Sequence, residues 1–419
     1  MASSPRWYVL TAAALLAAPL FISFAAYPVA AQTKSTRAQN KAYAANPPVA
    51  TVQPKQLPPR IPFSSADQAA ATIPGMPDAR FWADSVSDFN AALPSQPGPW
   101  LALSSGGADG AFGAGLINGL TESGKRPDYS VVTGVSTGAL MAPFVFAGPK
   151  YDGALRDAYT KISAADIFEI GGTGESFVDS WPLKDLIAKQ ITPDLLADIA
   201  AAQNSGRRLF VVTTDIDAGR PVVWNMGAIA AHGGEAAVKL FRTILLASSA
   251  IPGGFPPVLI DVEANGKKFQ EMHVDGGTLN QFFVAPASTL AASSDYKIPA
   301  TQIYAVINTG LQPQFQVVDR NTPSILTATV SAAVENDTRL MIDRVYIAAK
   351  RSEVGFNVAT IPPDFNAPSR GPFDPIYMGA LYQLGENLGK SATPFANQPP
   401  PYPSGPVLQS QYPEKTGAQ

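Results

Sequence analysis

The sequence predicts an α/β fold, a three-layer α/β/α sandwich with a mostly parallel central sheet. Between about residues 96 and 390, short apolar runs of strand length alternate with longer amphipathic runs of helix length. Hydrophobic residues make up 46% of the 419 positions, enough to bury a large core. Strands that alternate with helices are joined by crossovers, so helices are expected on both faces of the sheet.

The first 31 residues have the pattern of a signal peptide. Arg6 precedes an uncharged, mostly apolar run that ends in the small residues Val29-Ala30-Ala31. Small residues there suit cleavage before Gln32. The run is also nearly long enough to span a bilayer, so an uncleaved N-terminal anchor is the alternative. Both interpretations predict an exported protein that is periplasmic, secreted or membrane-anchored.

The patterned region is flanked by two proline-rich stretches. Residues 32–95 are rich in Pro, Ala, Gln and Thr and show little hydrophobic periodicity, which predicts an extended spacer. Residues 391–419 have a similar composition and predict a disordered tail. Residues 96–390 are therefore expected to form the folded domain.

The elements of this domain follow from its apolar runs, taken in chain order. We expect strands at 100–105, 129–134, 208–217 and 303–310, a hairpin partner at 219–226, and helices at 111–124, 137–148 and 236–250. Glycine or a polar turn closes most of these runs, as at Gly124 after the first helix.

Composition excludes several classes of function. The chain has no cysteine, which rules out disulfides, thiolate zinc sites and cysteine nucleophiles. Its formal net charge of −3 offers no basic face for nucleic acid. Only His232 and His273 are available for a histidine-based metal site or a Ser-His-Asp triad. No calcium loop of the EF-hand type is present, so we expect neither a metal nor another cofactor.

Ser136 is the first candidate catalytic residue. The stretch "GVSTG" places it between Gly134 and Gly138, after an apolar strand and before an apolar helix. A nucleophile elbow needs this context, because its sharp turn leaves no room for a Cβ at the flanking positions. The alternative is an ordinary glycine-rich strand-helix turn.

A glycine-rich loop precedes Ser136 by about 30 residues. The stretch "SSGGADG" (104–110) joins a strand to a helix, and its glycines leave backbone N–H groups free to face an anion. Its glycine spacing does not fit the GxGxxG pattern of dinucleotide-binding loops.

Asp275 is the second candidate catalytic residue. The stretch "MHVDGG" sets it before Gly276 and Gly277, and a carboxylate held by such a turn could accept a proton from Ser136. The alternative is a structural Asp-Gly turn. The preceding stretch "LLASSAIPGGFPPV" is expected to line a pocket.

In this order and spacing, the three stretches resemble the patatin-like phospholipase family. The connecting segments "ASSAIPGGFPPV" and "TTDIDAGRPVVW" are similar to that family as well, and the resemblance covers roughly residues 97–390. It implies a patatin-like hydrolase domain with a Ser136–Asp275 dyad that uses no histidine.

The resemblance also implies an oxyanion hole and a substrate class. Gly106 and Gly107, helped by Gly110, would supply its N–H groups. Asp275 works as a base only in a dry pocket that raises its pKa, so the dyad should be buried. The implied activity is that of a serine lipid acyl hydrolase of the phospholipase A or esterase type, with a lipid or membrane-surface substrate. A serine esterase or thioesterase on soluble esters and a non-catalytic lipid-binding protein are the alternatives.

The glycine loop departs from the family pattern at two positions. Ser105 replaces the first glycine, and Asp109 replaces the usual basic residue. A carboxylate near the oxyanion would oppose the developing charge. We therefore expect Asp109 to form a salt bridge with Arg242, or else to point away from the pocket. The alternative is that Asp109 lines the oxyanion pocket and slows the reaction.

The two histidines are expected to be structural. His273 lies two residues before Asp275, hence on the same face of a strand, where a structural hydrogen bond is expected and a Ser-His-Asp triad is the alternative. His232 is predicted to lie in a loop.

Overall fold

The computed structural model describes residues 57–172, 174–315, 317–402 and 408–409. The predicted signal peptide or anchor and the first part of the predicted spacer lie outside these residues. No helix within the described ranges is both long enough and apolar enough to cross a membrane.

In the described part of the chain, nine strands form one mixed sheet. At its centre, β12, β10, β2, β3 and β6 run parallel in that order. Beyond β6, the sheet continues with β7 and then β1, both in antiparallel pairing. β9 pairs antiparallel with the end of β6, and β8 pairs antiparallel with β9. The strand bounds are β1 Arg80–Trp82, β2 Pro99–Leu103, β3 Val131–Val135, β6 Arg208–Asp215, β7 Arg220–Asn225, β8 Val258–Ala264, β9 Lys267–Asp275, β10 Gln302–Ile307 and β12 Gly355–Thr360. Two short pairs stand apart, formed by β4 Glu169–Ile170 with β5 Val178–Asp179 and by β11 Gln314–Phe315 with β13 Leu408–Gln409.

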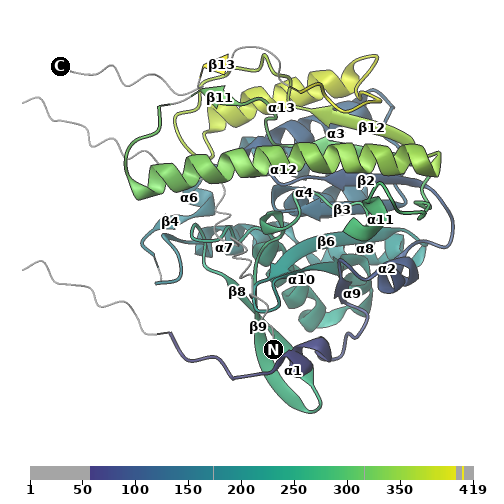
Figure 1. The fold of residues 1–419 in the computed structure, drawn as a ribbon, viewed down its shortest axis with the longest axis vertical. Coiled ribbons are helices and arrows are strands. Elements are labelled where there is room, and N and C mark those ends of the chain that lie inside the picture. Colours follow the sequence, from purple (N-terminus) through teal and green to yellow (C-terminus); the bar gives the residue numbers. More distant parts are fainter. Residues whose placement is uncertain (1–56, 173, 316, 403–407, 410–419) are drawn as a thin grey trace, which may run out of the picture.

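Helices cover both faces of the sheet, which makes the fold a three-layer α/β sandwich (Figure 1). The first layer, with the larger core cluster, includes α3 Gly110–Glu122, α4 Thr137–Ala147, α5 Asp152–Thr160, α6 Ala164–Ile167, α7 Trp181–Gln190, α8 Pro193–Asn204, α9 Met226–His232, α10 Gly234–Ser248 and α13 Pro375–Lys390. The opposite face packs on α2 Val86–Ala92, α11 Ala287–Leu290 and the long α12 Thr322–Ser352. The short α1 Ser65–Ala69 lies near the β8–β9 hairpin, and Gly107–Asp109 form a 3-10 turn before α3.

The alternation of sheet residues between the two cores explains why this sheet is covered on both sides. Leu101 and Leu103 of β2 belong to one core cluster, while Trp100 and Ala102 belong to the other. Successive strand residues point to opposite faces, so a continuous apolar run is what a doubly covered strand requires. The predicted α/β fold class is confirmed, and each of the eight predicted elements appears within a few residues of its expected bounds.

The prediction of an extended spacer is wrong for residues 57–95. They contain α1, β1 and α2, and Phe89 is buried beneath the sheet. Arg80 on β1 makes a bidentate ion pair with the buried Glu271 of β9. Proline-rich composition suggested a spacer, but apolar side chains such as Phe89 and the ion pair of Arg80 hold this segment on the domain.

The predicted tail also begins too early. Ala396 forms a backbone bridge with Val358 on β12, and Phe395 packs edge-on against Tyr304 of β10. Residues 391 to about 402 therefore belong to the folded domain, where they cover the β10–β12 end of the sheet.

Candidate active site

Ser136 lies at the turn between β3 and α4 in a conformation that L-amino acids rarely adopt. Its φ is 54° and its ψ is −122°. A Cβ on Gly134 would lie 2.4 Å from the Gly138 carbonyl oxygen, and one on Gly138 would lie 2.3 Å from that of Leu103. The backbone conformation of Ser136 costs about 1–3 kcal/mol and persists only where the surrounding structure imposes it. The turn thus has the geometry expected of a nucleophile elbow.

The Ser136 hydroxyl donates a hydrogen bond to Asp275. Its Oγ lies 2.6 Å from Asp275 Oδ2, and the two residues are only 6% and 5% exposed. Asp275 ends β9, where it pairs across the sheet with Thr213 of β6. Because β6 also neighbours β3, the sheet brings together two residues that are 139 positions apart.

Burial raises the pKa of Asp275 to about 7, against two weaker effects that lower it. These are the hydrogen bond from Ser136 and one from the Gly277 N–H, 2.7 Å from Oδ1. The turn after Asp275 requires glycine at position 276, because a Cβ there would lie 2.4 Å from the Val212 carbonyl oxygen. A carboxylate that is dry yet held by two donors is a stronger base than a solvated one.

Within the described part of the chain, the glycine loop contains two backbone amides without a hydrogen-bond partner. Among the described residues, the N–H groups of Gly106 and Gly107 have no hydrogen-bond acceptor. Gly110 differs from the expectation, because its N–H donates to the carbonyls of Gly107 and Ala108. Gly110 instead permits close packing, since a Cβ there would lie 2.2 Å from Thr137 Oγ1.

Ser105, the first departure from the family pattern, links the glycine loop to the Asp275 turn. Its hydroxyl donates to the Gln281 side chain, and its N–H donates to the Gln281 carbonyl at 2.8 Å. The Gln281 amide in turn donates to the Gly277 carbonyl at 2.6 Å. This bridge ties the amides of the loop to the turn that holds Asp275.

The salt bridge expected between Asp109 and Arg242 is absent from the described contacts. Asp109 accepts a 2.9 Å hydrogen bond from the Tyr377 hydroxyl, whereas Arg242 donates to the Ile191 carbonyl. Burial raises the pKa of Asp109 to about 7, although the Tyr377 bond lowers it. The raised pKa favours the protonated carboxyl, so this part-buried side chain does not need a cation as its partner.

Two residues that were not predicted from the sequence hydrogen-bond to Ser136 and Asp275. The Ser248 hydroxyl accepts a hydrogen bond from the Ser136 N–H at 3.0 Å and donates to the Val212 carbonyl at 2.7 Å. The Ala250 carbonyl accepts one from the Asp275 N–H at 2.9 Å. Both belong to the stretch "ASSAIPGG", whose serines before a Pro-Gly turn were the available signal.

His273 is part of a buried network rather than of the dyad. Its Nδ1 lies 2.9 Å from Thr213 Oγ1, and its Nε2 lies 3.3 Å from Glu271. Asp215, Glu271 and His273 also form a group whose possible metal-ligand atoms all lie within 4.8 Å of one another.

Each member of that group already has a protein partner. Arg80 forms an ion pair with Glu271, and the Gln68 side-chain amide donates a hydrogen bond to Asp215 at 2.6 Å. A salt-bridged and hydrogen-bonded network is the simpler interpretation. His232, predicted to lie in a loop, instead ends α9, where its ring lies 2.7 Å from Asp78.

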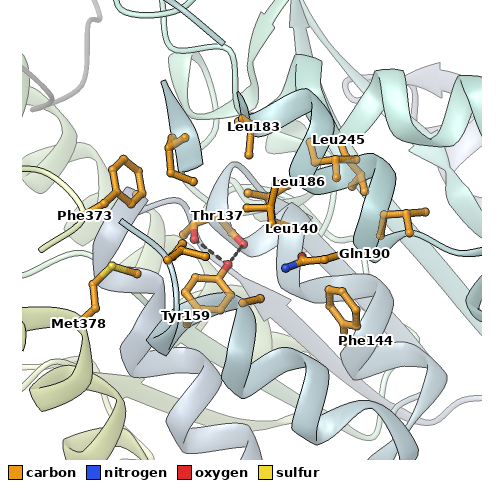
Figure 2. Close-up of a pocket in the computed structure, with 16 residues that line it drawn as sticks. Thr137, Leu140, Phe144, Tyr159, Leu183, Leu186, Gln190, Leu245, Phe373 and Met378 are labelled. Atoms are coloured by element: carbon orange, nitrogen blue, oxygen red, sulfur yellow. Dashed lines mark hydrogen bonds between the residues drawn. The ribbon is translucent and has the colours of Figure 1, made fainter. Parts of the chain in front are cut away.

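An apolar pocket, partly open to solvent, begins at Gly107 and Thr137. Phe373 and Met378 lie on one side, and α7 and Leu245 lie opposite (Figure 2). Its lining is Gly107, Thr137, Leu140, Phe144, Ala158, Tyr159, Ile162, Ile167, Leu183, Leu186, Ile187, Gln190, Ile191, Leu245, Phe373 and Met378. The Tyr159 hydroxyl bonds the Thr137 carbonyl and hydroxyl, both at 2.8 Å, so the polar end of this ring is satisfied. The pocket is therefore an almost wholly apolar space beside the dyad.

One family model matches part of the chain. The sequence model for patatin-like phospholipases matches residues 101–288, a span that includes the glycine loop, Ser136 and Asp275. No curated protein matches the chain. Among solved structures, the chain is similar to VipD from Legionella pneumophila, with 12% sequence identity and a TM-score of 0.36. The match covers 71% of this chain and 66% of the VipD chain, slightly less than two thirds of it.

Proposed function

We propose, from the match of residues 101–288 to the patatin-like phospholipase model, that the protein is a serine lipid acyl hydrolase. It would cleave carboxylic esters of lipids with Ser136 as nucleophile and Asp275 as general base. The observation that carries the proposal is the 2.6 Å hydrogen bond from Ser136 Oγ to a buried carboxylate whose pKa is raised to about 7.

The first half of the reaction forms an acyl-enzyme. Ser136 Oγ attacks the ester carbonyl carbon while its proton passes to Asp275 Oδ2. The tetrahedral intermediate collapses, the bond to the leaving alcohol breaks, and the alcohol oxygen takes the proton from Asp275. An aspartate can serve as this base because desolvation narrows the gap between its pKa and that of the hydroxyl.

The second half releases the acid. Water attacks the acyl-enzyme carbonyl as Asp275 accepts one of its protons, and Ser136 Oγ then leaves and regains a proton from Asp275. In both halves the negative charge on the carbonyl oxygen would be stabilised by the amides of Gly106 and Gly107. One such donor is worth about 3–4 kcal/mol in the transition state.

The shape and lining of the pocket support a lipid rather than a polar ester. Apart from Gly107, fifteen residues line the pocket, and most of their side chains are aliphatic or aromatic. The pocket begins at Thr137, the residue after the proposed nucleophile. Burying an acyl chain gains about 0.8 kcal/mol per methylene group, which favours long-chain over short-chain esters.

Hydrolysis assays on two substrates test the proposal. The wild type is expected to cleave both a short chromogenic ester and phosphatidylcholine in vesicles, and Ser136→Ala is expected to abolish both activities while its circular dichroism stays unchanged. Activity on the short ester alone would indicate a soluble-ester hydrolase. Full activity of Ser136→Ala would overturn the assignment, and absence of activity in the wild type would favour a non-catalytic lipid-binding protein.

We also propose that the protein is exported, on the pattern of Arg6, the apolar run and Val29-Ala30-Ala31. Mass spectrometry of protein from its native host is expected to find an N-terminus near Gln32 or, for a retained anchor, the intact chain in a membrane fraction. An intact chain confined to the soluble cytoplasm would contradict export.

A further inference from the structure

Large apolar side chains are exposed on both sides of the pocket. Ile170, Phe177 and Trp181 are 65%, 63% and 49% exposed, and Ile376 is 62% exposed. We call these four residues the apolar rim. An exposed group of this kind is unusual on a soluble surface and often marks an interaction site.

The rim is continuous with the pocket because the same elements supply both. Ile170 follows α6, whose Ile167 lines the pocket, and Trp181 begins α7, which contributes Leu183. In Figure 1, α6, β4 and α7 lie together at one edge of the molecule. This part of the rim therefore borders the space in which the acyl chain is proposed to bind.

The opposite side of the pocket has the same arrangement. Phe373 and Met378 line the pocket here. Ile376, between them in the sequence, lies in the first turn of α13 and is exposed. A planar apolar phase in contact with the rim on both sides would cover the entrance between them.

Trp181 combines an apolar ring with a satisfied polar end. Its Nε1 donates a 2.6 Å hydrogen bond to Glu169, so the ring can approach hydrocarbon without stranding its N–H. Tryptophan rings of this amphipathic kind concentrate at the boundary between lipid and water.

The charges beside the rim argue against electrostatic attraction to an acidic membrane. Between residues 169 and 185 the chain has four carboxylates, at Glu169, Glu175, Asp179 and Asp185, and one ammonium, at Lys184. Anionic lipid would repel this stretch, whereas a neutral or zwitterionic surface would not.

We propose that the apolar rim docks the protein on an electrically neutral or zwitterionic lipid surface, by hydrophobic contact, with the pocket mouth facing the lipid. This rests on the proposed function, because the docked orientation would pass an acyl ester directly to Ser136. Docking itself requires no catalysis and can be measured separately.

Vesicle binding in a catalytically silent background tests the docking. The full chain with Ser136→Ala is sedimented with phosphatidylcholine vesicles, alone and with Ile170→Ser and Ile376→Ser added. The two rim substitutions are expected to weaken partitioning about tenfold or more, because each removes a large apolar group from the contact. The matched control is Leu340→Ser with Ile347→Ser on α12, exposed by 40% and 46% on the opposite face of the sheet, and it should bind as the parent does.

Two further measurements sharpen the result. Vesicles with added phosphatidylserine should bind the parent no more tightly than pure phosphatidylcholine, and raising the salt concentration should not weaken binding. Brominated phosphatidylcholine should quench tryptophan emission, and Trp181→Phe should remove most of that quenching.

Unchanged binding of the rim variant, or an equal loss in the α12 control, would overturn the proposal, as would quenching that survives Trp181→Phe. Binding that needs phosphatidylserine and disappears in salt would replace it with an electrostatic surface. In the catalytically intact chain, the rim variant should keep its hydrolysis of a soluble short ester, whereas its hydrolysis of vesicle lipid should fall in proportion to the weaker binding. Loss of the short-ester activity in Ser136→Ala tests the proposed function alone, so the two ideas can fail independently.

Discussion

The carboxylate of Asp275 is almost entirely removed from water, and in the proposed mechanism this sets how strongly it can draw the proton from Ser136. A solvated aspartate, with a pKa near 4, is a poor base toward a hydroxyl. Burial raises the pKa of Asp275 to about 7, while the Gly277 N–H keeps the side chain aimed at the serine. The strained backbone at Ser136 and the Ser248 bond to its N–H hold the other partner in place.

Substitution of Asp275 should therefore be far more damaging than substitution of the nearby histidine. Asp275→Asn is expected to lower kcat/KM about a thousandfold or more, and its combination with Ser136→Ala should cost little beyond either single change, because the two groups act as a unit. His273→Ala should reduce the rate less than tenfold while lowering the melting temperature, because it leaves buried partners unsatisfied. If His273→Ala matches the rate loss of Ser136→Ala with an intact fold, a triad replaces the dyad.

The pH profile should report the same carboxylate. Asp275 must be ionised to accept the proton, so kcat/KM should rise with pH and level off above about 7, where its folded-state pKa lies. Asp109 also has a pKa raised to about 7, so either carboxyl could in principle produce the acid limb of the profile. The variant Asp109→Asn separates the two, because it removes this titration and keeps an acceptor for the Tyr377 hydroxyl. We expect the acid limb to persist in Asp109→Asn. Its disappearance would mean that Asp109 is the titrating group.

At the scale of elements, the contact between α3 and α13 holds one wall of the site. The helices approach so closely that a Cβ on Gly385 would lie 2.0 Å from the Phe112 carbonyl oxygen. The first turn of α13 in turn provides Tyr377, which bonds Asp109, and Met378, which lines the pocket. The glycines of the two helices thus position groups at the active-site end.

Gly385→Val should force the helices apart and lower the free energy of unfolding by about 1–3 kcal/mol or more. Gly379→Ala, on the same helix with nothing within 4 Å of the added carbon, should be neutral or stabilising by up to about 1 kcal/mol. Chemical denaturation of both variants measures the difference. Equal stability of the two would show that the α3–α13 contact is looser than described.

At the scale of the whole molecule, residues 57–95 are an integral part of the domain. A chain that begins at residue 96 would lose the Phe89 packing and the Arg80 partner of Glu271. Each loss is expected to cost about 3–5 kcal/mol, which together approach the whole stability of a typical domain. We expect this chain to lack a cooperative thermal transition when measured against one that begins at residue 57. A transition at the same temperature would restore the spacer interpretation.

The sequence was most informative where local chemistry decides local structure. Continuous apolar runs predicted β2, β3 and β6, and the flanking glycines predicted the turn at Ser136 because no other residue fits there. Long-range partners were beyond such reasoning. Nothing near Asp109 in the chain indicates Tyr377, 268 positions away, and the expected Arg242 instead bonds a carbonyl. β1 was missed because three residues paired to a distant strand leave little periodicity to recognise.

The central claim is that Ser136 is a nucleophile activated by Asp275. Peptide mass spectrometry after treatment with a fluorophosphonate tests it most directly, because only an activated serine reacts quickly with this probe. We predict a single adduct on Ser136 in the wild type, labelling at a similar rate in His273→Ala, and labelling slowed at least a hundredfold in Asp275→Asn. An adduct on another serine, or equally fast labelling of Asp275→Asn, would contradict the claim.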